Sequence, residues 1–192
     1  AMGKGIMALM DPLSLQFVPY SFLGVLLSIP GLISTVFLLR FEHKTPAAWY
    51  LAAALAGFTG SMIAMFLTAG VVLWGGVFWP MQDAWVVFSM AAVIGLIYHY
   101  PEKDTSGEAR LAQGLGIGAV VFAFGYSFRY AWGILVNHTF SQGTDFLYPY
   151  LMPVMLLLTL GLAVRRTIRF HRAALGCHSP QRGILAALFH PH

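Results

Sequence analysis

Residues 111–136 read LAQGLGIGAVVFAFGYSFRYAWGILV, an apolar run that contains a single charged side chain, Arg129. A helix of about 20 apolar residues, each rising 1.5 Å, is long enough to cross the hydrocarbon of a bilayer. This run therefore predicts a membrane-spanning helix that carries an arginine inside the membrane. The rest of the chain is expected to supply the surroundings which that charge requires.

The helix face that carries Arg129 is rich in glycine. Helical spacing places four glycines on it: Gly114, Gly118, Gly125 and Gly133. Such faces let two backbones approach closely, so they pack against other helices rather than against lipid. A charge at the bilayer centre costs about 2.5–3.5 kcal/mol on insertion scales unless it finds a partner or water. We therefore expect Arg129 to point into the protein.

The composition is that of a membrane protein. The 192 residues are 58% hydrophobic and only 9% charged, whereas soluble domains are about 25% charged. A single cysteine excludes an internal disulfide and the metal sites that need four cysteines. The net charge of +4 comes from Lys and Arg beside the ends of the apolar segments. That placement indicates membrane topology rather than a nucleic-acid partner.

Five apolar segments of helical length follow one another along the chain. We expect membrane spans at about residues 17–39, 47–73, 81–98, 111–136 and 145–164, with residues 74–80 (WGGVFWP) breaking the chain between the second and third. Residues 17–172 are then an all-α integral membrane bundle of five transmembrane helices. Residues 1–16 form an N-terminal tail, and residues 173–192 form a cytoplasmic tail. The tail ends in a new apolar run, which suggests truncation.

Small residues also share one face of each of the first two spans. These residues are Gly24, Ser28, Gly31 and Thr35 in the first span and Gly57, Ser61, Ala64 and Thr68 in the second. We expect both faces to pack against neighbouring helices. Thr45 followed by Pro46 predicts the start of the second helix, with threonine as the cap and proline in the first turn.

The distribution of positive charge predicts the orientation in the membrane. With five spans, one side carries Arg40, Lys44, Lys103, Arg110, Arg165, Arg166, Arg169, Arg172 and Arg182, and the other carries Lys4 alone. Cytoplasmic loops are enriched in Lys and Arg. We therefore expect a multi-pass protein of the cell inner membrane with its N-terminus outside and its C-terminus in the cytoplasm.

A candidate binding site follows from Arg129 and the acidic residues near the outer surface. Asp83, which opens the third span, is the expected partner of Arg129, and Asp145 is the second candidate. The expected site is completed by Gln82, Tyr126, Tyr130 and Trp85. Two interpretations are open: the ion pair only fixes the register of the helices, or it anchors a small ligand, lipid or partner in an outward-facing pocket.

The fifth span continues into a basic segment that contains Arg165, Arg166 and Arg169. One interpretation is a topology anchor that touches anionic lipid headgroups. The other is an output helix that carries motion of the bundle into the cytoplasm.

The positions of the histidine, lysine, serine and acidic residues do not indicate an active site or a bound cofactor. The histidines lie at the ends of spans or in loops, whereas axial haem ligation needs them at membrane depth. No span holds the lysine that retinal requires, and no paired carboxylates or serine and histidine occur at matching depth. We therefore expect a protein that is not an enzyme and that holds no cofactor or metal.

Three short stretches resemble a broad group of bacterial membrane regions. They are residues 78–82 (FWPMQ), 97–101 (IYHYP) and 107–111 (GEARL). The resemblance is to multi-span sensory regions, of five to seven spans, that precede histidine kinases, nucleotide cyclases or phosphatases. It implies a sensory input domain that binds a signal near Arg129 and relays it through the C-terminal helix. The alternatives are a structural or anchoring subunit of a larger membrane complex, a homodimer included, and a small transporter.

Overall fold

The computed structural model describes residues 19–40, 45–70, 75–100, 106–137 and 150–177, and these ranges contain helices and no strands. The helices are α1 (Pro19–Arg40), α2 (Pro46–Gly70), α3 (Gly75–His99), α4 (Gly107–Asn137) and α5 (Met152–Cys177). The predicted all-α class is confirmed for these ranges. The expected tail at residues 1–16 and most of the one at residues 173–192 lie outside them.

Four of the helices are long and apolar enough to cross a membrane. The four stretches are Phe22–Arg40, Pro46–Thr68, Phe78–His99 and Gly107–Gly133. Helix α5 is not among them, because its apolar part ends at Val164 and arginines follow. The first five residues of the predicted fifth span, 145–149, lie outside the described ranges. The structure thus supports a membrane helical bundle with four such helices, and the fifth crossing stays a prediction.

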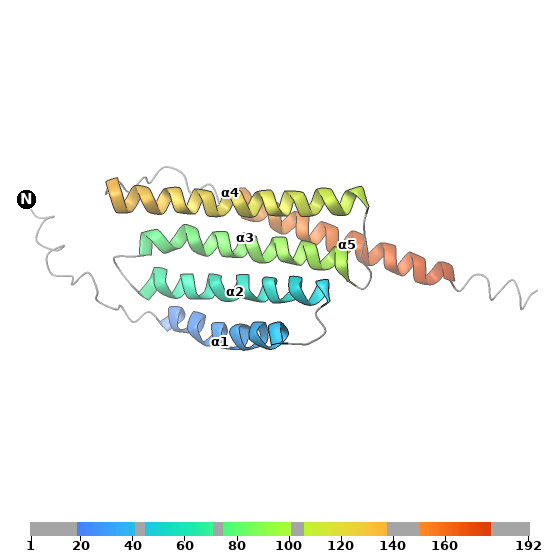
Figure 1. Cartoon of the computed structure of the whole chain (residues 1–192), viewed down its shortest axis with the longest axis horizontal. Coiled ribbons are helices and arrows are strands. Elements are labelled where there is room, and N and C mark those ends of the chain that lie inside the picture. The colour runs from blue at the N-terminus through green and yellow to red at the C-terminus, as the bar shows by residue number, and fades with distance from the viewer. Residues whose placement is uncertain (1–18, 41–44, 71–74, 101–105, 138–149, 178–192) are drawn as a thin grey trace, which may run out of the picture.

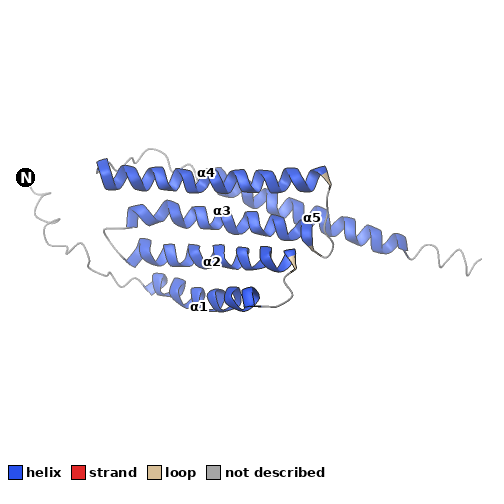
Figure 2. Ribbon diagram, viewed as in Figure 1, coloured by secondary structure: helices blue, strands red, loops and turns tan. Residues whose placement is uncertain are grey.

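The helices α1 to α4 lie side by side in chain order, as Figure 1 and Figure 2 show. Each packs against the next, and α3 also packs against α5. Helix α3 is therefore the centre of the bundle, whereas α1 packs chiefly against α2. The C-terminal part of α5 extends past the ends of the other helices (Figure 1).

The core lies around α3 and consists largely of small side chains. Its buried members include Ala84, Val87 and Ile94 of α3 and Ala123 of α4, none of which is exposed to solvent. Small side chains let helices approach closely and gain dispersion contacts, which is the main source of packing energy in lipid. Large apolar residues such as Leu26, Ile33 and Phe37 of α1 are instead exposed, as expected for side chains that face lipid.

The predicted small-residue faces of α1 and α2 are confirmed as packing faces. Gly24, Ser28 and Gly31 are buried, as are Gly57, Ser61 and Ala64. A Cβ added at Gly24 would lie 2.9 Å from the backbone oxygen of Met62, and one at Gly57 would lie 2.9 Å from the backbone nitrogen of Ser89. At both positions the helices touch so closely that only glycine fits.

Helix α4 packs through a different face from the one predicted. Its buried face carries small residues at helical spacing: Ala109, Ala112, Gly116, Ala123, Ser127 and Ala131. A Cβ added at Gly114, Gly118, Gly125 or Gly133 would meet nothing within 4 Å. The prediction that this glycine face packs inside the protein is therefore wrong. Ser127 lies on the buried face, where its Oγ is 2.8 Å from the backbone oxygen of Pro80 in α3 and also 2.8 Å from that of Ala123 in its own helix. Its single hydroxyl hydrogen is shared between these two acceptors.

The starts of α2 and α4 are capped by hydroxyl side chains. The backbone N–H of Ala48 donates to Thr45 Oγ1 at 3.3 Å, which confirms the predicted cap, and the N–H of Ala109 donates to Ser106 Oγ at 3.2 Å. The expected break before the third span is wrong at residues 75–80, because α3 already begins at Gly75. Pro80 lies near the start of that helix and removes a single backbone hydrogen bond there.

Candidate functional site

Arg129, the centre of the predicted site, lies on the exposed side of α4. It makes no hydrogen bond or ion pair within the described ranges of the chain. The prediction that its side chain points into the protein is therefore wrong, because α4 buries its alanine face against α3 and turns the arginine outward. A role of Arg129 in ligand binding stays a prediction. Asp145, its second candidate partner, lies outside the described residues.

The predicted site residues on α3 are all at least partly buried. Asp83 is buried, with 3% of its surface exposed, and Gln82 is half-buried. The Trp85 ring meets Phe124 of α4 edge-on, with ring centroids 5.3 Å apart. A Cβ at Gly60 of α2 would lie 2.6 Å from the same indole. Trp85 therefore joins three helices, and this position explains its burial without a ligand.

The predicted tyrosines stand in a row along α4. Tyr126 and Tyr130 are half-buried, and their rings stack with centroids 6.4 Å apart. Tyr126 also packs against the buried core, whereas Arg129 on the same helix faces out. A shared binding site of Arg129 with the other five predicted residues stays a prediction.

A second cluster joins three helices at the opposite end of α4. Its centre is Glu108, in the first turn of that helix. Tyr98 of α3 donates its hydroxyl hydrogen to Glu108 Oε1 at 3.1 Å. From α5, Arg165 Nη1 lies 3.1 Å from Oε1, and Arg169 Nη2 donates to Oε2 at 2.9 Å. Both carboxylate oxygens of Glu108 are therefore engaged. We call these four residues the Glu108 joint.

Arg166 adds an aromatic contact to the Glu108 joint. Its guanidinium carbon lies 4.9 Å from the ring centroid of Phe170 and 6.0 Å from that of Tyr98. Tyr98 is buried, while the two arginines that bind Glu108 are about half-exposed. A single exposed ion pair adds little to the stability of a protein. Two arginines that bind the same carboxylate nevertheless restrict how the side chains are oriented relative to one another. The joint links α5 to α3 and to α4 at this end of the bundle.

Arg165 and Arg169 of this cluster, and Arg166 beside it, were predicted from the sequence as output residues, whereas Glu108 and Tyr98 were not predicted. The available signal was an acidic residue in the first turn of a helix, beside the positive end of the helix dipole. That signal explains why a glutamate is favourable at this position. It does not identify partners that lie 61 residues away in the chain.

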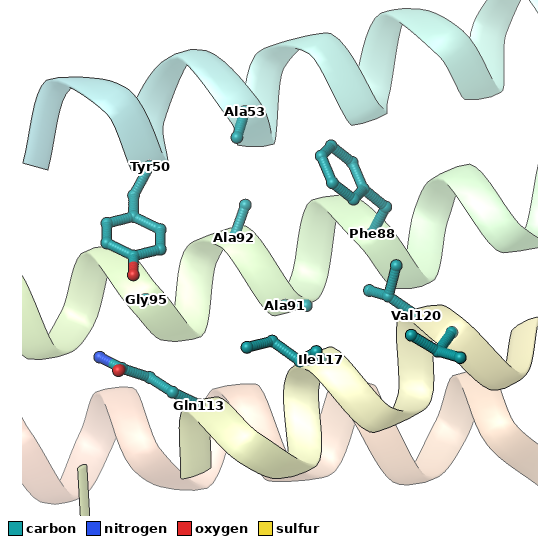
Figure 3. Close-up of a pocket in the computed structure, with 10 residues that line it drawn as sticks. Tyr50, Ala53, Phe88, Ala91, Ala92, Gly95, Gln113, Ile117 and Val120 are labelled. Carbon is teal, nitrogen blue, oxygen red and sulfur yellow. The ribbon is translucent and has the colours of Figure 1, made fainter. Parts of the chain in front are cut away.

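A cavity of about 220 Å³ lies between α2, α3 and α4, as Figure 3 shows. Most of its lining is apolar, including Ala53, Phe88, Ile117 and Val120. The polar groups that line it are the Tyr50 hydroxyl and the Gln113 amide, which face one another beside Gly95. A side chain at position 95 would overlap the Tyr50 ring, so the glycine makes room for it.

The described residues contain no cluster of metal-binding side chains. No three of their His, Cys, Asp and Glu side chains gather as a metal site would require. His99 Nδ1 lies 2.8 Å from the backbone oxygen of Gly95, and its ring lies 4.7 Å from that of Tyr50. This histidine is thus held by the end of α3 and by α2.

Comparison with known proteins adds no assignment. No family model, no curated protein and no solved structure matches the chain.

Proposed function

We propose that this chain is a membrane-embedded sensory input module that relays a signal to the cytoplasm through α5. The observation that carries the proposal is the Glu108 joint. Helices α4 and α5 are not among the pairs that pack extensively, yet the Glu108 carboxylate holds two arginines of α5. A shift of α4 would therefore act on α5 through a few defined bonds.

Helix α4 has the form of a lever between the proposed input and the output. It is one helix of 31 residues that carries Arg129 near one end and Glu108 at the other. The two residues are 21 positions apart, which corresponds to about 32 Å along a helix. A ligand, lipid or partner that binds near Arg129 and prefers one position of α4 would bias the joint at the far end.

The charge distribution supports the proposed orientation in the membrane. Arg40, Arg110 and the arginines of α5 gather at the end of the bundle that contains the Glu108 joint, whereas Arg129 lies toward the other end. By the positive-inside rule the joint faces the cytoplasm and the N-terminus lies outside. This arrangement suits a protein of the bacterial inner membrane.

A fifth crossing by α5 is part of the proposal. The apolar part of the helix, from Met152 to Val164, would cover about 20 Å, whereas the hydrocarbon is about 30 Å thick. The crossing therefore needs the preceding residues, from about 145, to continue the span. The segment after Val164 would then project into the cytoplasm as the output helix.

Pulsed EPR distance measurements in lipid nanodiscs test the relay. One spin label is placed on the native Cys177 at the end of α5, and the other on an introduced cysteine, Tyr100→Cys, after α3. We expect Glu108→Gln and Arg169→Ala to broaden or shift the distance distribution. Arg172→Ala is the matched control, because it removes a charge from α5 outside the joint. Identical distributions in all variants would show that the joint does not set the position of α5 and would refute the relay.

A second candidate function is an anchoring subunit of a larger membrane complex. The open glycine face of α4 favours it, because a Cβ at Gly118 or Gly125 would meet nothing within 4 Å. Such a face allows close approach by another helix. Purification in mild detergent separates the two functions: an anchoring subunit copurifies with a protein partner in fixed stoichiometry, whereas an input module does not require one.

A further inference from the structure

The cavity between α2, α3 and α4 opens sideways to the surface of the bundle. Two residues of its α4 wall, Ile117 and Val121, are 65% and 68% exposed. The α4 wall runs from Gln113 to Val121, which is about 12 Å along the helix. The four stretches of membrane-spanning character include all three walls, so the opening would face lipid rather than water.

The polarity of this cavity changes along the helix axes. Tyr50 lies four residues from the start of α2 and Gln113 six residues from the start of α4, about 6 and 9 Å inside the helix ends. The lining farther from those ends is apolar and includes Phe88 and Val120 (Figure 3). A ligand that fits has a polar group near the membrane surface and an apolar chain that points toward the membrane centre.

A positive charge stands one turn nearer the surface than Gln113. Arg110 precedes Gln113 by three residues and Ile117 by seven, so the three share one face of α4. Its side chain is exposed and makes no hydrogen bond or ion pair within the described residues. Three residues of a helix correspond to about 4.5 Å, so Arg110 lies about 4.5 Å nearer the membrane surface along α4 than Gln113.

We propose that this cavity binds one acyl chain of a glycerophospholipid. The chain lies along Ile117 and Phe88. An ester carbonyl oxygen accepts hydrogen bonds from the Tyr50 hydroxyl and the Gln113 amide. The phosphate lies above, against Arg110. His99 Nδ1 donates its hydrogen to the backbone oxygen of Gly95 at 2.8 Å and so cannot accept one from Gln113 Nε2, which lies 3.5 Å away. The N–H groups of Gln113 are therefore available to the lipid.

The polar groups lie at two depths, with Tyr50 and Gln113 in the cavity and Arg110 nearer the surface. This arrangement fits a phospholipid better than a free fatty acid. A fatty acid has one polar group, the carboxylate, whereas a glycerophospholipid has ester carbonyls and, nearer the surface, a phosphate. The volume of about 220 Å³ is below the 300–1,000 Å³ of sites for drug-sized molecules. It suits one chain better than a bulky ring system.

Native mass spectrometry of the full chain in mild detergent tests the proposal. The protein is titrated with dioleoyl phosphatidylglycerol and, in a separate series, with oleate. We expect one retained phospholipid. Arg110→Ala and Gln113→Leu should each weaken its binding by about threefold to tenfold, the equivalent of one lost hydrogen bond or ion contact. Arg40→Ala, which removes an exposed arginine at the same end of the bundle, is the matched control and should bind as wild type does.

Val121→Trp tests the cavity without touching the polar groups. Val121 is exposed, so the larger ring can fill the opening while the fold stays intact, and we expect the phospholipid adduct to be lost. Equal adducts in wild type, Arg110→Ala and Val121→Trp would overturn the proposal. It would also be overturned by oleate binding that depends on Gln113 but not on Arg110, or by a dimer that Val121→Trp disrupts.

Discussion

The glycine faces of α1 and α4 have nearly the same sequence spacing and opposite surroundings. Gly24 and Gly31 of α1 are buried against α2, whereas Gly118 and Gly125 of α4 are exposed. The difference lies in the rest of each helix. Away from its small residues α1 carries large apolar side chains, while α4 has a second small face made of alanines and Ser127. A small-residue pattern therefore shows that a face can pack, and competition between faces decides which one does.

The open face of α4 also explains the position of Arg129. Once the alanine face of α4 packs against α3, the arginine must lie outside the core. Inside the membrane such a side chain extends toward the surface to reach water or headgroups. A buried arginine, by contrast, would require Asp83 as its partner. The two arrangements predict different effects of substitution.

The largest expected effect comes from filling the buried glycine face. In Gly24→Leu the new side chain would meet the backbone of Met62 at 2.9 Å, and overpacking of this kind costs about 1–3 kcal/mol. Thermal unfolding in detergent should show the loss. Gly118→Leu is the matched control and should not destabilise the chain, because its side chain enters open space and leucine favours a helix over glycine by about 0.5–1 kcal/mol. Equal losses in the two variants would mean that both faces are buried.

A smaller loss is expected from the hydroxyl that holds α4 on α3. Ser127→Ala removes a hydroxyl that shares its hydrogen between the backbone oxygens of Pro80 in α3 and Ala123 in its own helix, and it should cost about 0.5–1.5 kcal/mol. Ser28→Ala serves as the control, because Ser28 bonds to Val25 of its own helix and should cost less. Chemical denaturation in detergent measures both. If Ser28→Ala lowers the free energy of unfolding as much as Ser127→Ala does, the contact of Ser127 with Pro80 adds nothing to stability.

The smallest effect is expected at Arg129. Arg129→Leu should change the stability of the purified chain by less than about 0.5 kcal/mol, because the side chain is exposed. A buried ion pair with Asp83 would behave differently, since removing one member of such a pair costs about 3–5 kcal/mol. Thermal unfolding of Arg129→Leu beside Arg129→Lys distinguishes the two cases, and a large loss in the leucine variant alone would restore the buried pair.

The sequence predicted those features that depend on short stretches of chain. The apolar runs, the cap at Thr45 and the packing faces of α1 and α2 are all local patterns, and the structure agrees with them. The orientation of α4 was mispredicted because its glycine and alanine faces are equally compatible with close packing. Alanine also leaves a methyl group to make dispersion contacts, which glycine lacks.

The candidate sites were harder to predict because they join distant parts of the chain. Arg165 and Arg169 stand out as charges after an apolar run, but their partner Glu108 is fixed by the way α5 packs on α3. The cavity likewise needs Tyr50 and Gln113 to meet across Gly95. Gln113 stands out in the sequence as a polar residue inside an apolar helix. The residues beside it cannot be predicted from the sequence, because they depend on how three helices pack.

The most direct test of which α4 face is buried is the oxygen accessibility of spin labels in lipid bilayers. With Cys177 replaced by serine, single labels are placed at Gly118 and Gly125 on the open face. Two more are placed on the packed face, at Ala123, which is buried, and at Ala119, which is partly buried against the core. We predict that labels at positions 118 and 125 collide freely with oxygen dissolved in the lipid, and that labels at 119 and 123 are protected. Protection at 118 and 125 with exposure at 119 and 123 would contradict the structure and return Arg129 to the interior.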